Sequence, residues 1–158
     1  MEKSAGMTVI GLAMALIWVT IPALPAFSHC EIPCGIYGDE MRFGMMKEDI
    51  ATIEKSMKKV VELSKQASPD HNQIVRWVQN KEHHADKIRD VATQYFMAQR
   101  VKPVLSRESA EHVAYVKKLK LLHAMIVTSM KCKQTTDLAH VEKLKRLLDA
   151  FSKVYLGN

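Results

Sequence analysis

The side chains best suited to chemistry lie together in one nine-residue segment, His29-Cys30-Glu31-Ile32-Pro33-Cys34-Gly35-Ile36-Tyr37. It places an imidazole and two thiols within six residues. A cut in the chain just before His29 adds a free amine to this set. Imidazole, amine and thiolate groups are ligands for transition metals. The segment is therefore the strongest candidate for a metal site.

The 28 residues before this segment have the pattern of a removable leader. The stretch Met7–Ile21 is almost unbroken apolar sequence, shorter than the about 20 residues of a membrane span. Ala26 and Ser28 are small residues at the third and first positions before His29, as in an A-x-A-like cleavage site. We predict a signal-peptide-like cleavable leader over residues 1–28. A retained N-terminal anchor and a cytoplasmic propeptide removed by a dedicated protease are the alternatives.

Composition narrows the class of the mature chain. Removing 28 of the 158 residues leaves 130, which suits one domain. The net charge of +6 stays with the mature part, because Glu2 and Lys3 cancel. The basic residues alternate with acidic ones and form no dense run, so no nucleic-acid partner is predicted. A mild positive field attracts small anions. No membrane span is expected in the mature form.

Residues 39–158 show helical rather than strand periodicity. We expect a first helix over 39–67, a second over 69–99 with Ser68 as N-cap and Pro69 at its first position, and a third over 106–131. The fourth is capped by Thr135 and Thr136 and ends at Gly157. Short connections predict an all-α, antiparallel up-and-down four-helix bundle, with residues 29–38 as a loop at its N-terminal edge.

Each predicted helix carries an apolar stripe that should face the core. The four stripes are Met46, Ile50, Ile53, Met57 and Val60; Ile74, Val78, Ala85, Ile88, Ala92 and Tyr95; His112, Val116, Leu119, His123, Ile126 and Met130; and Leu138, Val141, Leu144, Leu148, Phe151 and Tyr155.

The helical part offers weaker candidates for a metal site. No Glu is followed by His three residues later, which argues against a di-iron centre. The adjacent His83 and His84 point in different directions on a helix, and His112 and His123 lie about three turns apart. These four are interpreted as surface or core-edge histidines, and His71 and His140 carry no signal. Cys132 is interpreted as a structural thiol, although neighbouring lysines are able to lower its pKa.

The donors in the loop 29–38 define the metal that they suit. They are the His29 amine, the Cys30 amide nitrogen and the thiolates of Cys30 and Cys34. Adjacent amine and amide nitrogens close a five-membered chelate, and a planar nitrogen–sulfur set suits Ni(II) or Cu(II). The His29 imidazole is placed to bind axially. Pro33 stiffens the turn and Gly35 permits a backbone angle closed to other residues, so both shape the hook.

Two other interpretations of the cysteines stay open at this point. A Cys30–Cys34 disulfide suits an exported protein, although a loop this short would be strained. A zinc site needs two further ligands, and the sequence shows no second cluster to supply them.

The pattern H-C-x-x-P-C-G-x-Y, at a processed N-terminus and followed by a helical domain of this length, resembles nickel superoxide dismutase. The resemblance implies that His29 binds nickel through its amine and imidazole, Cys30 through its amide and thiolate, and Cys34 through its thiolate. It also implies that Tyr37 stands over the open face as the catalytic residue that holds the anion or a water.

The same resemblance implies the activity and the assembly. The enzyme would convert superoxide to oxygen and hydrogen peroxide, with one nickel ion per subunit cycling between Ni(II) and Ni(III), as an antioxidant defence. Family members are homohexamers of four-helix bundles. The alternative function is an exported helical-bundle protein that binds nickel or copper without enzymatic activity.

This chain departs from the family pattern in three places. Glu31 stands where many members have Asp, at the mouth of the site. A Glu often found early in the first helix has no match near Gly44 and Met45, and its Arg partner is not matched by Arg76. The leader favours an extracytoplasmic enzyme, periplasmic or secreted, and implies a processing protease. A cytoplasmic enzyme with a propeptide is the alternative.

Overall fold

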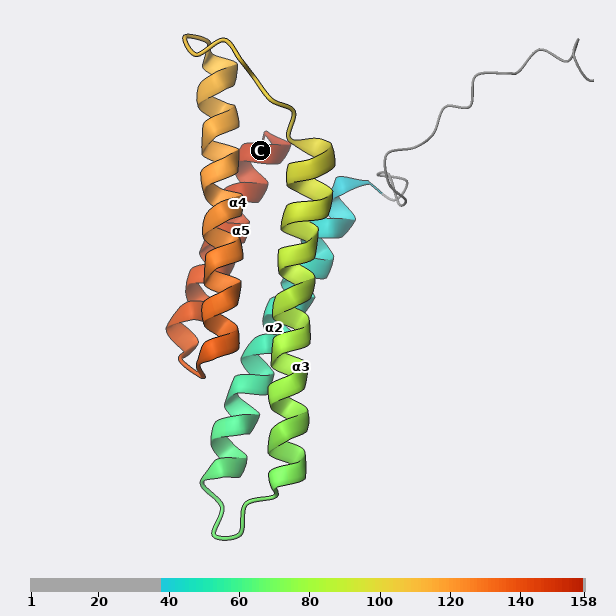
Figure 1. Cartoon of the computed structure of the whole chain (residues 1–158), viewed down its shortest axis with the longest axis vertical. Coiled ribbons are helices and arrows are strands. Elements are labelled where there is room, and N and C mark those ends of the chain that lie inside the picture. The colour runs from blue at the N-terminus through green and yellow to red at the C-terminus, as the bar shows by residue number, and fades with distance from the viewer. Residues whose placement is uncertain (1–37, 158) are drawn as a thin grey trace, which may run out of the picture. The chain divides into compact units, whose positions relative to one another are not determined.

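The computed structural model describes residues 38–157, and this part is helical without a strand. Its elements are α2 (Asp39–Ser64), α3 (His71–Asp90), the π-helix η1 (Val91–Arg100), α4 (Ala110–Gln134) and α5 (Leu138–Leu156). Because η1 continues α3 directly, the described residues form four long helical segments (Figure 1). The predicted all-α four-helix bundle is confirmed.

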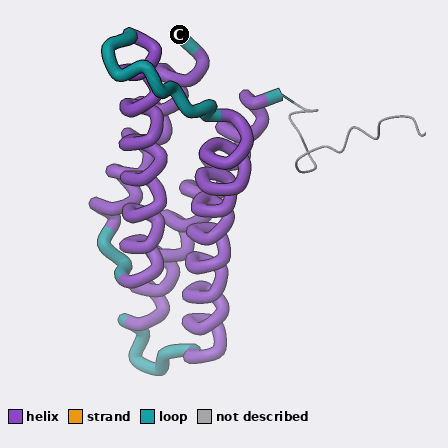
Figure 2. The backbone as a smooth tube through the Cα atoms, turned by 45° about the horizontal axis from the view of Figure 1, so that its top comes forward, coloured by secondary structure: helices purple, strands orange, loops and turns teal. Residues whose placement is uncertain are grey.

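Successive helical segments run in opposite directions (Figures 1 and 2). α2 packs against α3 and α5, and α4 packs against the same two helices. The start of α2, the end of η1, the loop 101–109 and the end of α5 therefore lie at one end of the bundle. We call it the N-end, because it is the end at which the loop 29–38 joins α2.

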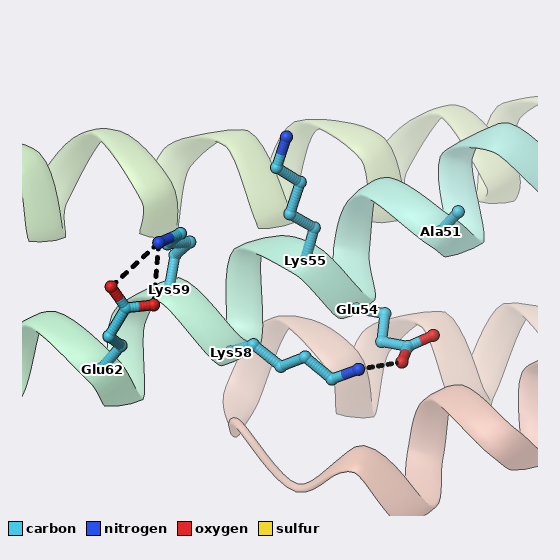
Figure 3. A pocket seen from close by; sticks show the side chains of 6 residues that line it. All are labelled: Ala51, Glu54, Lys55, Lys58, Lys59 and Glu62. Atoms are coloured by element: carbon cyan, nitrogen blue, oxygen red, sulfur yellow. Dashed lines mark hydrogen bonds and ion pairs between the residues drawn. The ribbon is translucent and has the colours of Figure 1, made fainter.

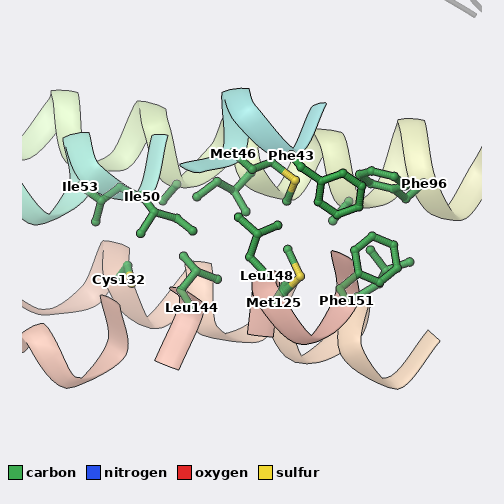
Figure 4. Close-up of a cluster of buried hydrophobic side chains, with 14 of the residues drawn as sticks. Phe43, Met46, Ile50, Ile53, Phe96, Met125, Cys132, Leu144, Leu148 and Phe151 are labelled. Atoms are coloured by element: carbon green, nitrogen blue, oxygen red, sulfur yellow. The ribbon is translucent and has the colours of Figure 1, made fainter. Parts of the chain in front are cut away.

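The core follows the predicted stripes of α2 and α5 closely. Met46, Ile50, Ile53 and Met57 of α2 are buried, as are four residues of the α5 stripe: Val141, Leu144, Leu148 and Phe151 (Figure 4). Toward the N-end the core becomes aromatic, with Phe43, Phe96, Phe151 and Tyr155 in contact at centroid distances of 4.9–5.9 Å. Aromatic side chains bury large apolar areas, so this cluster fixes α2, η1 and α5 against one another.

The predicted core face of α4 was partly wrong: Leu119 and Ile126 pack against the core, but the fully buried residues lie beside them. The buried residues are Leu122, Met125 and Cys132, together with the hydroxyl residues Thr128 and Ser129. Met130, which was expected inside, is exposed. His123 is exposed as well, which agrees with its interpretation as a surface or core-edge histidine. Apolar side chains occur almost all round this helix, so its periodicity does not select a face. Thr128 tolerates burial because its hydroxyl donates to the Ala124 carbonyl oxygen at 2.7 Å.

Three helices also begin at residues other than those predicted. α3 is capped by Asp70, whose Oδ1 accepts from the Gln73 amide at 3.1 Å, rather than by Ser68. Ser109 caps α4, which begins later than expected, and Asp137 caps α5 in place of Thr135 and Thr136. In each case a later residue reaches the free amides of the first turn. The other end of α5 is as predicted, since Gly157 has φ 77°.

The predicted second helix changes its winding near its end. η1 is a π-helix, closed by the Val101 amide, which donates to the Phe96 carbonyl oxygen at 2.8 Å. In an α-helix, with about 3.6 residues per turn, residues five apart point to different sides. The i→i+5 bonding of a π-helix brings them closer to one side. Tyr95 and Arg100 are such a pair, and both serve the site described next.

Candidate metal centre

The predicted nickel ligands His29, Cys30 and Cys34 lie outside the described residues, as do Tyr37 and the remaining predicted members of the hook, Glu31, Pro33 and Gly35. Their donor set can still be tested against nickel by its chemistry. One amine, one amide and two thiolates form the nitrogen–sulfur set that square-planar Ni(II) accepts. The donors of this segment therefore fit the metal. The structure adds the domain to which the segment is joined.

The first described residue is Gly38, and its backbone conformation sets the direction in which the chain enters α2. Gly38 has φ 78° and ψ 155°, a backbone region open essentially to glycine alone. It precedes α2, whose first turn carries Asp39 and Glu40. Carboxylates at a helix N-terminus interact favourably with the helix dipole. A glycine turn and a helix start thus lie directly after Tyr37.

Asp39 is the centre of a hydrogen-bonded cluster at the N-end. Its Oδ1 accepts from the Tyr95 hydroxyl of η1. Its Oδ2 accepts from the Tyr155 hydroxyl of α5 at 2.7 Å and from Arg100 at 2.8 Å (Nη2) and 3.2 Å (Nε). The Asp39 side chain is only 14% exposed. One carboxylate therefore joins three elements at the bundle end that receives the hook.

The cluster holds its members in defined charge states. Burial by itself would raise the pKa of Asp39, but hydrogen bonds from Arg100, Tyr95 and Tyr155 bring that pKa below its usual value. Burial and the hydrogen bond to Asp39 raise the pKa of Tyr155 to about 12 and raise that of Tyr95. At neutral pH the cluster contains a carboxylate, two protonated phenols and a guanidinium.

Further cations surround this cluster. The Arg42 guanidinium lies 4.6 Å from the centroid of the Tyr95 ring, and Lys118 Nζ lies 5.4 Å from that of Tyr155. A surface hollow beside them is lined by Arg100, Val101, Lys102, Val104, Glu111, Ala114, Tyr115 and Lys118. Arg100 is paired with Asp39, but Lys102 and Lys118 against Glu111 still leave the hollow a positive balance, which favours the approach of small anions.

Two histidines of the bundle, His84 and His112, have polar partners outside the Asp39 cluster. His84 Nδ1 lies 2.6 Å from Oδ1 of the buried Asp49, and Lys87 Nζ lies 3.4 Å from the same oxygen. His112 Nδ1 lies 2.9 Å from the Val104 carbonyl oxygen. Within residues 38–157, no group of three or more His, Cys, Asp or Glu side chains is arranged to hold a metal ion.

Cys132 is a buried thiol of the core. Burial raises its pKa to about 11, even though Lys81 acts in the opposite direction. The suggestion that neighbouring lysines lower its pKa was therefore wrong, and its interpretation as a structural residue fits its position. Lys81 itself donates to the carbonyl oxygens of Lys133 and Thr135, at 2.6 and 3.1 Å, and so caps the end of α4.

The remaining surface features are chemically plain. Gly44 and Met45 are exposed, and Arg76 lines a shallow hollow with Gln73, Trp77 and Asn80. A second hollow runs along α2 and is lined by Ala51, Glu54, Lys55, Lys58, Lys59 and Glu62 (Figure 3). Lys58 pairs with Glu54 and Lys59 with Glu62, so these charges largely satisfy one another.

The Asp39 cluster was not anticipated from the sequence. Tyr95 and Tyr155 were assigned to apolar stripes, and Asp39 was taken only as the start of a helix. One available signal was the two tyrosines themselves, because a buried Tyr hydroxyl usually requires a hydrogen-bond partner. Two tyrosines near helix ends predict an acceptor there, although not which acceptor.

The family model for nickel-containing superoxide dismutase matches residues 24–158, which include both the hook and the whole bundle. The chain belongs to the nickel-containing superoxide dismutase family. No curated protein and no solved structure gives a significant match.

This superoxide dismutase converts superoxide to oxygen and hydrogen peroxide, and nickel is its cofactor. The nickel hypothesis, one ion per subunit, is thereby confirmed at the level of the family. No helix within residues 38–157 is long and apolar enough to cross a membrane.

Proposed function

We propose that superoxide is dismutated at residues 29–37 after the chain has been cut before His29. The observation that carries this is the sequence His29-Cys30-Glu31-Ile32-Pro33-Cys34 within the region that matches the family. His29 holds nickel through its amine and imidazole, and Cys30 through its amide and thiolate. Cys34 supplies the second thiolate.

Each of these residues has a task that its chemistry explains. When bound, nickel supplies a one-electron couple, so that two superoxide ions and two protons become one oxygen and one hydrogen peroxide. The thiolates and the amidate favour the higher oxidation state by donating charge. Tyr37 holds the anion or a water by hydrogen bonding, and Glu31 lies at the mouth of the site. Pro33 and Gly35 restrict the backbone to a hook.

The leader proposal follows from the need for a free amine. A chain that keeps residues 1–28 has a peptide nitrogen at His29, which must lose its proton before it can bind a metal, whereas a free amine offers a lone pair directly. We propose that a protease removes the leader and that the mature enzyme is extracytoplasmic, periplasmic or secreted. The apolar stretch Met7–Ile21 and the small residues before His29 support this.

The proposed assembly is a homohexamer, as the family resemblance implies. The described surface carries apolar side chains that an interface would cover, among them Val75, Leu105 and Val113 at 54%, 90% and 67% exposure. The mass of the native particle by light scattering tests this. A particle with the mass of a monomer, at the protein concentration used in the activity assay, would contradict the homohexamer.

A one-residue extension tests the ligand assignment sharply. The protein beginning at His29 is compared with the same protein carrying one added Ala before His29. The extension retains every side chain but moves the amine out of its chelate. We expect the native form to bind one nickel and turn over superoxide, and the extended form to lose both.

The outcomes separate the rival functions. Equal activity of the two forms would contradict the amine ligand. Nickel or copper binding without turnover in the native form would favour a metal-binding bundle without enzymatic activity. An intact mass that shows a Cys30–Cys34 disulfide, without an effect of metal, would favour a structural loop.

A further inference from the structure

We infer that Asp39 is a positioning residue for the nickel site: its cluster with Tyr95, Arg100 and Tyr155 fixes the end of the hook to the bundle. The inference rests on the proposed ligands in residues 29–34. It assigns to the bundle a task beyond scaffolding, namely holding the hook in place before the metal binds.

The chain between the Asp39 cluster and the proposed ligands is short. Cys34 precedes Asp39 by five residues. Five residues of extended chain span at most about 18 Å. The point at which Asp39 is held therefore limits where the second thiolate can lie. A shift or loosening of Asp39 is transmitted to the hook through few rotatable bonds.

Asp39 is held unusually firmly for a residue at a helix start. Four hydrogen bonds reach its two oxygens from three side chains. Helix ends commonly fray, because their first amides lack intrahelical partners. Here the carboxylate is mostly buried and accepts charge-assisted bonds from Arg100, which are stronger than neutral ones.

Two separate elements, η1 and α5, supply the donors of these hydrogen bonds. The π-helical winding of η1 brings Tyr95 and Arg100 to one side, and the Arg100 guanidinium lies 5.8 Å from the Tyr95 ring centroid. π-Helical winding is rare in proteins and occurs frequently at functional sites. Tyr155 arrives from the last turn of α5, with its ring packed on Phe43 and Phe96.

A glycine lies between the cluster and the hook. Gly38 adopts φ 78° and ψ 155°, so the chain leaves Asp39 in a direction that other residues reach only with strain. No atom lies within 4 Å of the place where a Cβ on Gly38 would stand. The requirement for glycine is thus one of backbone direction and not of space, as a device that aims the hook would need.

The consequence concerns metal affinity. A hook that is free to move loses conformational entropy when it binds nickel, whereas a hook held at one end loses less. Loss of residues that orient metal ligands typically lowers metal affinity about 10–100-fold. We expect Asp39→Asn to weaken nickel binding by about 10-fold or more. Arg100→Gln removes two of the four hydrogen bonds and should act in the same direction with a smaller effect.

The control is a matched substitution in the same helix. Asp49→Asn also removes a buried carboxylate of α2, one with a side chain 5% exposed and paired with His84 and Lys87. It lies ten residues beyond Asp39 and outside the cluster. Both variants should lower the melting temperature of the metal-free protein. Only Asp39→Asn should change the nickel dissociation constant, measured by competition with a chelator, and the absorption spectrum of the nickel complex.

The full protein beginning at His29 is used throughout. Unchanged affinity and spectrum in Asp39→Asn would overturn the inference, and so would equal losses in Asp39→Asn and Asp49→Asn. If Asp39→Asn does not fold, the partly exposed Arg100→Gln decides by the same readouts, and unchanged nickel binding in it overturns the inference. Failure of the unsubstituted protein to bind nickel would instead refute the proposed ligands.

Discussion

At the scale of single residues, the three cysteines occupy two chemical settings. Cys30 and Cys34 lie just after the proposed cut before His29, which would give them an amine and an imidazole as neighbours in the sequence. Cys132 lies in the core, where burial raises its pKa to about 11. A thiol with that pKa stays protonated at neutral pH and is a poor nucleophile there.

This difference predicts opposite effects of cysteine substitutions. Cys30→Ser and Cys34→Ser should each abolish nickel binding and superoxide turnover, because a hydroxyl does not replace a thiolate donor. Cys132→Ala should keep both and cost about 1 kcal/mol of stability, the usual effect of a point substitution. Nickel content by mass spectrometry and a superoxide assay check this. A serine variant of the hook with normal nickel content would contradict the ligand assignment.

At the scale of elements, α2, η1 and α5 meet at one carboxylate. Tyr155 shows how this junction depends on pH. Burial and Asp39 raise its pKa to about 12 from the usual 10. The folded protein therefore holds this proton more tightly than the unfolded chain does. The stabilisation is complete below pH 10 and is lost as the pH rises toward 12.

Tyr155→Phe should accordingly remove part of the alkaline dependence. The substitution deletes one hydrogen bond to a carboxylate and should cost about 1–2 kcal/mol at neutral pH. Urea unfolding at several pH values between 8 and 12 checks it. The free energy of unfolding should fall less steeply above pH 10 in the variant than in the parent. Parallel curves would show that Tyr155 does not titrate as described.

The elements also show how far the sequence leads. The stripes of α2 and α5 predicted their buried faces, because polar residues occupy the opposite faces of those helices. The face of α4 was not predictable in this way, since apolar residues surround it and packing makes the choice. The winding of η1 has no simple pattern signal, and therefore the meeting of Tyr95 and Arg100 at Asp39 was out of reach. The hook was recognisable because its chemistry lies in consecutive residues.

At the scale of the whole molecule, the proposed leader and the proposed metal site meet at the peptide bond between Ser28 and His29. Retention of residues 1–28 leaves His29 within a peptide chain. We expect the uncut protein to fold its helical bundle but to bind nickel weakly and show no turnover. Circular dichroism, nickel content and the superoxide assay on cut and uncut protein check this. Full activity of the uncut protein would rule out the amine as a ligand.

Net charge acts at the same scale. The protein carries +6 and its substrate is an anion. Attraction of this kind weakens as salt shortens the Debye length from about 30 Å at 0.01 M to about 8 Å at 0.15 M. We expect kcat/KM to fall severalfold over that range.

A charge-matched pair of variants locates the effect. Lys102 lines the hollow beside the Asp39 cluster, whereas Lys65 follows the far end of α2. Both Lys102→Glu and Lys65→Glu lower the net charge by the same amount. We expect Lys102→Glu to reduce kcat/KM more at low salt. Equal reductions would indicate a response to net charge alone and would contradict local steering at the N-end.

The proposed dismutase site is the processed hook, residues 29–37, loaded with nickel. The most direct measurement is superoxide consumption by protein beginning at His29, titrated with nickel from zero to two equivalents. We expect activity that rises linearly and stops at one equivalent per subunit, with none in the metal-free protein. Activity that does not depend on nickel, or a loaded protein without turnover, would contradict it.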